Sequence, residues 1–164
     1  MTFLETDRLN LRNIQPKDAP TVFDYRNDLR CARHQRGQTK DLPGIEALIS
    51  AHQSDALGTE ENCLIAVADK QTDELIGEII VMPNEDCFSL GYTFHYAHHR
   101  QGYAFEALSA LIELLHGRYP DWEFISFTDT DNVASMGLLR KLGYRDMGYI
   151  EKLDSQMFGK WVKE

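Results

Sequence analysis

Apolar and polar residues alternate near the start of the chain, which predicts a first strand from Leu9 to Ile14. Pro16 then begins a turn, and Asp18 can cap a first helix that runs to about Arg30. A second helix is expected over residues 42–52. Three apolar runs separated by turn-forming residues then predict an antiparallel meander of strands over Cys63–Ala68, Leu75–Met82 and Cys87–Phe94.

The spacing of apolar residues changes to a helical period after the third of these strands. From Ala104 to Leu115 they recur three and four positions apart, which predicts an amphipathic helix over residues 102–116. A short strand over residues 122–128 follows, and a further helix begins near Asn132 and ends at Gly143, a residue typical of the left-handed position after a helix. Two strands end the chain, near Tyr144–Glu151 and Gln156–Val162.

These elements predict one domain that spans residues 1–164 and belongs to the α/β (α+β) class. The strand–helix–strand order from Cys87 to Thr128 is a βαβ-like unit, which requires a mixed sheet. We expect a twisted, mostly antiparallel sheet of about seven strands, flanked on its two faces by about four helices. A chain of 164 residues with 43% hydrophobic residues can bury such a core.

The composition argues against several classes of protein. With a formal net charge of −9 and no basic stripe, the chain lacks the charge pattern of a nucleic-acid binder. No apolar run reaches the roughly 20 residues that span a bilayer, and the first residues do not resemble a secretory signal, so we expect a cytoplasmic protein without a membrane partner. Cys31, Cys63 and Cys87 fit neither a zinc site nor a disulfide framework, and each is expected to be a small core residue.

The segment between the third meander strand and the amphipathic helix carries the strongest chemical signal. A basic loop follows Phe94 and leads to Gly102 at the start of the helix. Unpaired N–H groups and the helix dipole make such a terminus an anion site, Gly102 lets a phosphate approach closely, and Arg100 adds positive charge. The residues alone indicate a phosphate-bearing ligand, with an ordinary glycine turn as the alternative.

Three segments of the sequence resemble one known family. The run from His99 to Ala104 resembles the coenzyme A motif of the GNAT superfamily of N-acetyltransferases, Gln/Arg-x-x-Gly-x-Gly/Ala, with His99 at the position where Gln or Arg is usual. The run from Asn132 to Tyr144 resembles the second signature of the same superfamily. The opening from Thr6 to Arg12, with Asp18 beyond it, is similar to the branch of Rim-type ribosomal-protein N-terminal acetyltransferases.

The resemblance covers nearly the whole chain and implies a single GNAT-like domain that binds acetyl-CoA. In that fold the fourth and fifth strands diverge, the pantetheine arm lies between them, and the pyrophosphate lies on the N–H groups at the start of the motif helix. A histidine at position 99 would make any phosphate contact there weaker or pH-dependent. The implied acetyl-CoA-binding residues are Tyr92, Thr93, Phe94, His99, Arg100, Gln101, Gly102, Tyr103, Ala104, Phe105, Asn132 and Ser135.

The resemblance also implies candidates for catalysis. Leu139 stands where many relatives carry a proton-donating tyrosine, so Ser135 is the candidate donor to the departing thiolate, against the alternative of a helix-surface serine. A main-chain N–H near Phe94 is the candidate oxyanion donor. Glu78 is a candidate general base if apolar neighbours on its strand favour its protonated form, but a solvated strand carboxylate is the favoured interpretation.

Function is therefore expected to be direct transfer of an acetyl group from acetyl-CoA to a primary amine, with a protein N-terminus as one acceptor. A small-molecule amine (polyamine, amino sugar or amino acid) is the close alternative, and a coenzyme A-binding module without catalysis is a third. We expect the acceptor pocket to form from residues 30–54 and the last two strands. No helical or strand period places His95, His98 and His99 on one side, so no metal is expected, and a homodimer is left open.

Overall fold

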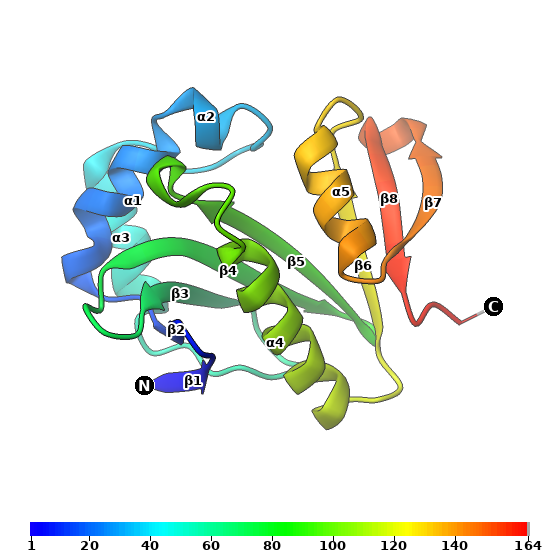
Figure 1. The fold of residues 1–164 in the computed structure, drawn as a ribbon, viewed down its shortest axis with the longest axis horizontal. Helices are drawn as coiled ribbons and strands as arrows, with labels where there is room; N and C mark the ends of the chain where they lie inside the picture. The colour runs from blue at the N-terminus through cyan, green and yellow to red at the C-terminus, as the bar shows by residue number, and fades with distance from the viewer. Residues whose placement is uncertain (164) are drawn as a thin grey trace.

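One continuous mixed sheet forms the centre of the computed structural model, which describes residues 1–163 (Figure 1). Its eight strands in those residues are Thr2–Glu5 (β1), Leu9–Asn13 (β2), Cys63–Asp69 (β3), Leu75–Asn84 (β4), Cys87–Phe94 (β5), Glu123–Thr128 (β6), Arg145–Ile150 (β7) and Ser155–Lys160 (β8). They are arranged in the order β1-β2-β3-β4-β5-β6-β8-β7. Neighbours are antiparallel except β5 and β6, which are parallel, so the expected mixed and mostly antiparallel sheet is confirmed.

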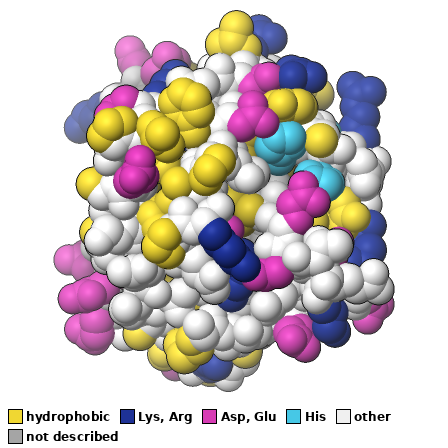
Figure 2. All heavy atoms as spheres, turned by 90° about the vertical axis from the view of Figure 1, so that its left-hand side faces the viewer, with side chains coloured by type: hydrophobic (Ala, Val, Ile, Leu, Met, Phe, Trp, Pro, Cys, Tyr) yellow, Lys and Arg dark blue, Asp and Glu magenta, His cyan; other side chains and the backbone are white. Residues whose placement is uncertain are grey.

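Helices cover both faces of this sheet, as expected. The described residues contain five α-helices: Ala19–Arg26 (α1), Leu29–Ala32 (α2), Leu42–His52 (α3), Tyr103–Arg118 (α4) and Val133–Lys141 (α5). α1 and α3 lie on one face, and α4 lies on the other beside α5 (Figure 1). On the side of α1 to α3, basic and acidic side chains are scattered among hydrophobic ones (Figure 2). None of the described helices has both the length and the apolar character needed to cross a bilayer.

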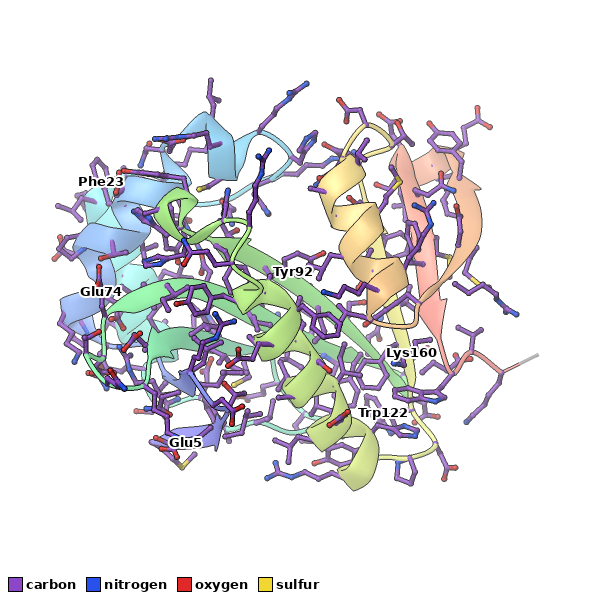
Figure 3. The ribbon with its side chains drawn as sticks, viewed as in Figure 1. Glu5, Phe23, Glu74, Tyr92, Trp122 and Lys160 are labelled. Atoms are coloured by element: carbon purple, nitrogen blue, oxygen red, sulfur yellow. The ribbon has the colours of Figure 1, made fainter. Side chains whose placement is uncertain are left out.

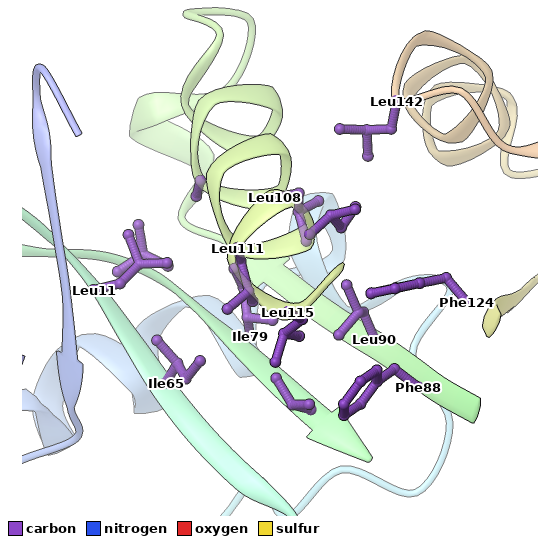
Figure 4. Packing of buried hydrophobic residues seen from close by; sticks show 14 of the residues in the cluster. Leu11, Ile65, Ile79, Phe88, Leu90, Leu108, Leu111, Leu115, Phe124 and Leu142 are labelled. Atoms are coloured by element: carbon purple, nitrogen blue, oxygen red, sulfur yellow. The ribbon is translucent and has the colours of Figure 1, made fainter. Parts of the chain in front are cut away.

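The alternation of side chains along β3 divides the core into two layers. Ile65 and Val67 belong to the large cluster beneath α4, whereas Leu64 and Ala66 belong to the cluster beneath α1 and α3. Figure 4 shows the larger cluster, in which the apolar stripe of α4 packs on the sheet. The period of two along the strand and of about 3.6 along the helix therefore puts into the core the apolar residues that the sequence indicated.

Three details differ from the sequence-based prediction. β1 was not expected, because its four residues are too short a run to show a period. The expected first helix is divided, since α1 ends at Arg26 and Asp28 caps the separate turn α2 by accepting a hydrogen bond from the N–H of Arg30. Asp18 makes no side-chain cap to α1, because its carboxylate accepts hydrogen bonds from Arg12 and from the N–H of Gln15.

The separation of β5 from β6 is the feature of the fold that creates a site. The two strands pair only where Cys87–Ser89 lies beside Glu123–Ile125. Beyond that point β5 continues along β4 to Phe94, while β6 continues along β8 to Thr128. From Leu90 to Phe94 one edge of β5 therefore has no strand neighbour among residues 1–163, and we call it the open edge of β5. β5 and β6 are the fourth and fifth of the strands expected from the sequence, because β1 was not expected. The divergence implied by the family resemblance is therefore present.

A buried ion pair joins α1 to β4 beside this region. Glu78 is 3% exposed, and its two carboxylate oxygens accept hydrogen bonds from Arg26 at 2.8 Å and 2.7 Å. The favoured interpretation of Glu78, a solvated strand carboxylate, is therefore wrong, whereas its candidate role as general base stays a prediction. In a regular strand, Ile76 would share a face of β4 with Glu78. A register shift between β3 and β4 interrupts the alternation, so Ile76 lies in the cluster beneath α4 instead.

We expect Arg26→Ala to lower the free energy of unfolding by about 3–5 kcal/mol, because the substitution leaves the Glu78 carboxylate buried without a partner. Replacing both residues, as Arg26→Met with Glu78→Leu, should restore much of that loss. Urea unfolding followed by circular dichroism measures both effects. Arg30→Ala is the control, since its ion pair with Asp28 is at the surface and its loss should change stability little. Equal stability of Arg26→Ala and the wild type would contradict the conclusion that Glu78 depends on Arg26 as its buried partner.

Candidate active site

The loop between β5 and α4 presents main-chain N–H groups at the end of the open edge. Arg100 and Gly102 both adopt left-handed backbone conformations, with φ of 62° and 81°. The first main-chain hydrogen bond that closes a turn of α4 runs from the N–H of Glu106 to the carbonyl of Gly102, so the N–H groups of residues 103–105 precede it. Such a terminus attracts anions through these donors and through the helix dipole.

A cation from the start of the chain lies against this terminus. Arg8 donates to the carbonyl of Gln101 at 3.0 Å, forms an ion pair with Glu106 at 2.7 Å, and stacks 4.1 Å from the ring centre of Tyr103. Burial tends to raise the pKa of Glu106, but hydrogen bonds from Thr6 and Arg8 outweigh it and lower that pKa. Sequence reasoning missed Arg8 as a neighbour of Gly102, although it lies within the opening run that resembles the family.

Side chains from two loops bind the open edge of β5. The carbonyl of Tyr92 accepts a hydrogen bond from Gln35 at 3.0 Å, and the carbonyl of Phe94 accepts one from His99 at 2.7 Å. Thr93 lies between them and opposite Glu78 in the ladder, so its main-chain groups face β4 by the alternation of an antiparallel pair. Of the three strand residues expected to bind pantetheine, Tyr92 and Phe94 thus have main-chain oxygens on the open side.

His99 does not lie with the other residues of the coenzyme A motif. Its ring is turned back to the carbonyl of Phe94 and lies 4.0 Å from the sulfur of Cys31. Of the two other histidines of this segment, His95 faces Asp24 at 2.8 Å and His98 packs against the ring of Tyr103, while their own ring centroids lie 5.9 Å apart.

Cys31 is a half-buried thiol at the open edge rather than a core residue. Its sulfur donates to the carbonyl of Phe94 at 3.2 Å. Burial raises the pKa of Cys31 to about 11, so the thiol stays protonated at neutral pH. Since the thiolate is the nucleophilic form, this environment favours direct transfer over an acyl-cysteine.

A tyrosine and a serine meet across the separation of the strands. The hydroxyl of Tyr92 lies 2.7 Å from the hydroxyl of Ser135, which is in the first turn of α5. Figure 3 shows the Tyr92 side chain extending from β5 toward α5. Burial raises the pKa of Tyr92, and the hydrogen bond with Ser135 offsets part of that effect. Asn132 caps α5 by accepting a hydrogen bond from the N–H of Ser135 at 3.2 Å. Leu139 is buried in the core.

A cavity of about 310 Å³ lies at the carboxyl end of β6, and we call it the β6 cavity. Its wall combines the loop after α2 with the carboxyl end of β6 and the start of β8. Gln35 connects this wall to the open edge through its hydrogen bond to Tyr92. The lining residues are His34, Gln35, Arg36, Phe127, Thr128, Asp129, Leu153 and Ser155.

Charged side chains form a network at the wall of the β6 cavity. Nδ1 of His34 lies 3.2 Å from Asp129 and 3.5 Å from Asp131, and one ligand atom from each of the three lies within 4.8 Å of the others. Arg36 binds Asp129, and Arg33 lies 3.8 Å from Asp131. These arginines already balance both carboxylates, so the cluster is an ion-pair network, which the sequence did not indicate.

Comparison with known proteins decides the family. Residues 8–145 match the family model described as an acetyltransferase (GNAT) domain. The chain belongs to the GNAT acetyltransferases. This GNAT protein is an acyl-CoA-dependent acetyltransferase that moves an acetyl group from acetyl-CoA to an amine.

Relatives and solved structures agree with that assignment. The GNAT chain is 29% identical over 147 residues to YkkB of Bacillus subtilis, with 87% of this chain and 84% of YkkB covered. It is also 29% identical over 154 residues to the N-acetyltransferase YoaA of Bacillus subtilis, with 91% and 86% covered. A GNAT-family acetyltransferase from Bacillus anthracis has the same fold, with a TM-score of 0.81 at 18% identity over 97% of this chain and 96% of that one.

The ribosomal L7/L12 α-N-protein acetyltransferase RimL, solved in complex with coenzyme A, has the same fold too. Its TM-score is 0.79 at 14% identity, with 98% of this chain and 97% of RimL covered. At this identity the likeness concerns the fold alone.

The described residues fit acetyl-CoA at the open edge and the start of α4. Main-chain donors at residues 103–105 and the guanidinium of Arg8 suit the pyrophosphate, and the open edge suits an amide-rich arm. A Cβ added at Gly102 would lie 3.5 Å from Arg8, in ordinary contact, so a small side chain there does not collide with the protein.

We expect Gly102→Asp to lower the affinity for acetyl-CoA by about tenfold or more, because its carboxylate would stand where the pyrophosphate approaches. Gly102→Asn is the matched control, since asparagine has the same shape and tolerates the same left-handed backbone without the charge. Titration calorimetry with acetyl-CoA measures both. Equal affinities of the two variants would show that the pyrophosphate binds elsewhere.

Proposed function

We propose that the acceptor amine is the N-terminus of a protein or peptide, and that it enters through the β6 cavity. The observation that carries this proposal is the apolar rim of the cavity. Phe127 and Leu153 line it and remain 45% and 48% exposed. Large apolar side chains left half-exposed beside a cavity favour a ligand that brings its own side chains, as a peptide does and a small polar amine does not.

Ser135 is the proposed proton donor in this reaction. Acetyl-CoA supplies the thioester whose acetyl group is transferred. The hydroxyl of Ser135 gives a proton to the sulfur as it leaves, and the phenol of Tyr92 lies at hydrogen-bond distance to replace that proton. The raised pKa of Tyr92 keeps the phenol protonated at neutral pH. Arg100 to Phe105 and Asn132 are proposed to hold the phosphates and the pantetheine arm.

Glu78 is less suited to the role of general base than the sequence suggested. Arg26 engages both of its oxygens, so accepting a proton would break a buried ion pair. The ion pair also lies on the side of the sheet that carries α1. We therefore propose that Glu78 positions β4 rather than receives the proton of the amine.

A small-molecule amine is the second candidate, and one observation favours it. Asp129 lines the β6 cavity, and a polyamine could compete with Arg36 for its carboxylate. A module that binds coenzyme A without catalysis is disfavoured, because Tyr92 and Ser135 form an intact donor pair at the open edge.

A panel of amines tests the acceptor, with release of free thiol from acetyl-CoA as the readout. We expect peptides with a free N-terminus to have higher kcat/KM than polyamines, amino sugars or free amino acids, and mass spectrometry to place the acetyl group on the α-amine. Phe127→Ser should lower kcat/KM for peptides by about tenfold, because burial of an aromatic side chain contributes about 1.5–3 kcal/mol. Val133→Ser, at an exposed apolar residue that does not line the cavity, is the control. Faster turnover of a polyamine than of every peptide would reject the proposal.

Replacement of the donor hydroxyl gives a further prediction. Ser135→Ala should lower kcat by about 10²-fold, the low end for a general acid, because water can partly replace it. The affinity for acetyl-CoA should stay the same, since the lost interaction matters only as the thiolate forms. Ser109→Ala, at a serine in α4, is the matched control. If Ser135→Ala retains the full kcat with a good acceptor, the proton comes from solvent.

A further inference from the structure

The imidazole of His34 lies in the wall of the β6 cavity and faces a carboxylate. Its side chain is 21% exposed, and Nδ1 lies 3.2 Å from Oδ2 of Asp129. We propose that His34 is the general base that takes the proton of the acceptor amine, with Asp129 as the residue that positions it. This inference rests on the proposed entry of the amine through the β6 cavity.

The carboxylate of Asp129 selects the useful tautomer of the ring. An anion beside Nδ1 favours the proton on that nitrogen, which leaves the lone pair of Nε2 free to accept another. Burial tends to raise the pKa of Asp129, but hydrogen bonds from His34 and Arg36 outweigh it and hold that pKa below its usual range. Asp129 therefore stays ionised across the working pH range and stabilises the imidazolium that forms.

The other charged groups around His34 limit how far it can move. Asp131 faces the same Nδ1 at 3.5 Å, and Arg33 lies 3.8 Å from Asp131. Arg36 holds Asp129 and also donates to the carbonyl of Leu153 at 2.8 Å. This network fixes the loop after α2 against the ends of β6 and β8, and so keeps the ring in the cavity wall.

Hydrogen bonds connect the loop that carries His34 to the strand and the helix that carry the proposed acid. Gln35, the next residue, donates to the carbonyl of Tyr92, whose hydroxyl meets Ser135. Asp129 follows β6, and its carbonyl accepts from the N–H of Asn132, the cap of α5. Figure 1 shows the loop after α2 reaching toward α5 above the separation of β5 from β6. His34 as the base and Ser135 as the acid thus belong to opposite sides of the separation and can act in the same acetyl transfer.

The protons balance in this arrangement. An ammonium in the cavity gives one proton to Nε2 of His34, and the free amine nitrogen then forms its bond to the acetyl carbon as the carbon–sulfur bond breaks. Ser135 protonates the sulfur. His34 passes its first proton to solvent and then takes the excess proton of the new amide nitrogen, while a proton from solvent restores Ser135 through the hydroxyl of Tyr92, so one proton is released net. The products are an N-acetyl amide and free coenzyme A thiol, and no oxidant or reductant is needed.

His34→Gln tests the role, because glutamine keeps a hydrogen-bonding group but cannot take the proton. With a peptide acceptor at pH 7 we expect kcat to fall by about 10²–10⁴-fold, with the affinity for acetyl-CoA unchanged by calorimetry. The rate of the variant should rise with pH toward that of the wild type, because an α-amine with a pKa of about 7.7–8.0 loses its proton unaided. Asp129→Asn should reproduce much of the loss.

The controls separate this inference from the proposed function. His52 forms a second histidine–aspartate pair, 2.7 Å from Asp55, and does not line the β6 cavity, so His52→Gln should keep the wild-type rate and pH profile. A wild-type protein that acetylates no peptide would reject the proposed function. A wild-type protein that acetylates peptides while His34→Gln keeps its rate and pH profile would reject only the role of His34. Loss of wild-type activity on treatment with EDTA would also overturn the role of His34 as a base, in favour of a metal bound by His34 and Asp129.

Discussion

The site depends on one constraint, the divergence of two parallel strands after three residues of pairing. β5 remains hydrogen-bonded to β4 and β6 to β8, so neither strand can close the space between them. Main-chain groups of Tyr92 and Phe94 then lie on an edge that pairs with side chains instead of a strand. The same space lets a residue on β5 reach a residue on α5, and it gives the loop after α2 room to approach β6.

Local patterns in the sequence predicted most of the fold. The continuous apolar run of β3 and the helical period of α4 are strong signals because each extends over a whole element. β1 has no such repeat, and the break after Arg26 depends on Asp28 capping a new turn. Gly143 has a φ of 93°, so the glycine signal at the end of α5 corresponds to a real left-handed residue.

The candidate site was predicted less completely, because its contacts join residues far apart in the chain. The coenzyme A motif located the start of α4, but Arg8 reaches it from the other end of the sequence. Glu78 pairs with Arg26, 52 positions away, and no local period shows that a strand carboxylate has such a partner. The sequence named residues 30–54 and the last two strands for the acceptor pocket, which stays a prediction, and gave no sign that His34 and Asp129 would meet.

The position of Arg8 has a consequence for the effect of ionic strength on acetyl-CoA binding. A net charge of −9 repels an anionic ligand at long range, whereas Arg8 and the start of α4 would attract the phosphates of a ligand placed beside them. Mobile ions screen charges beyond the Debye length of about 8 Å at physiological salt. Repulsion of the ligand by distant acidic residues is therefore screened at lower salt than its attraction to the adjacent Arg8. Added salt should therefore speed the encounter while it weakens the final contact. The two effects oppose each other, and the affinity should pass through a broad maximum rather than fall steadily as it does for a basic protein.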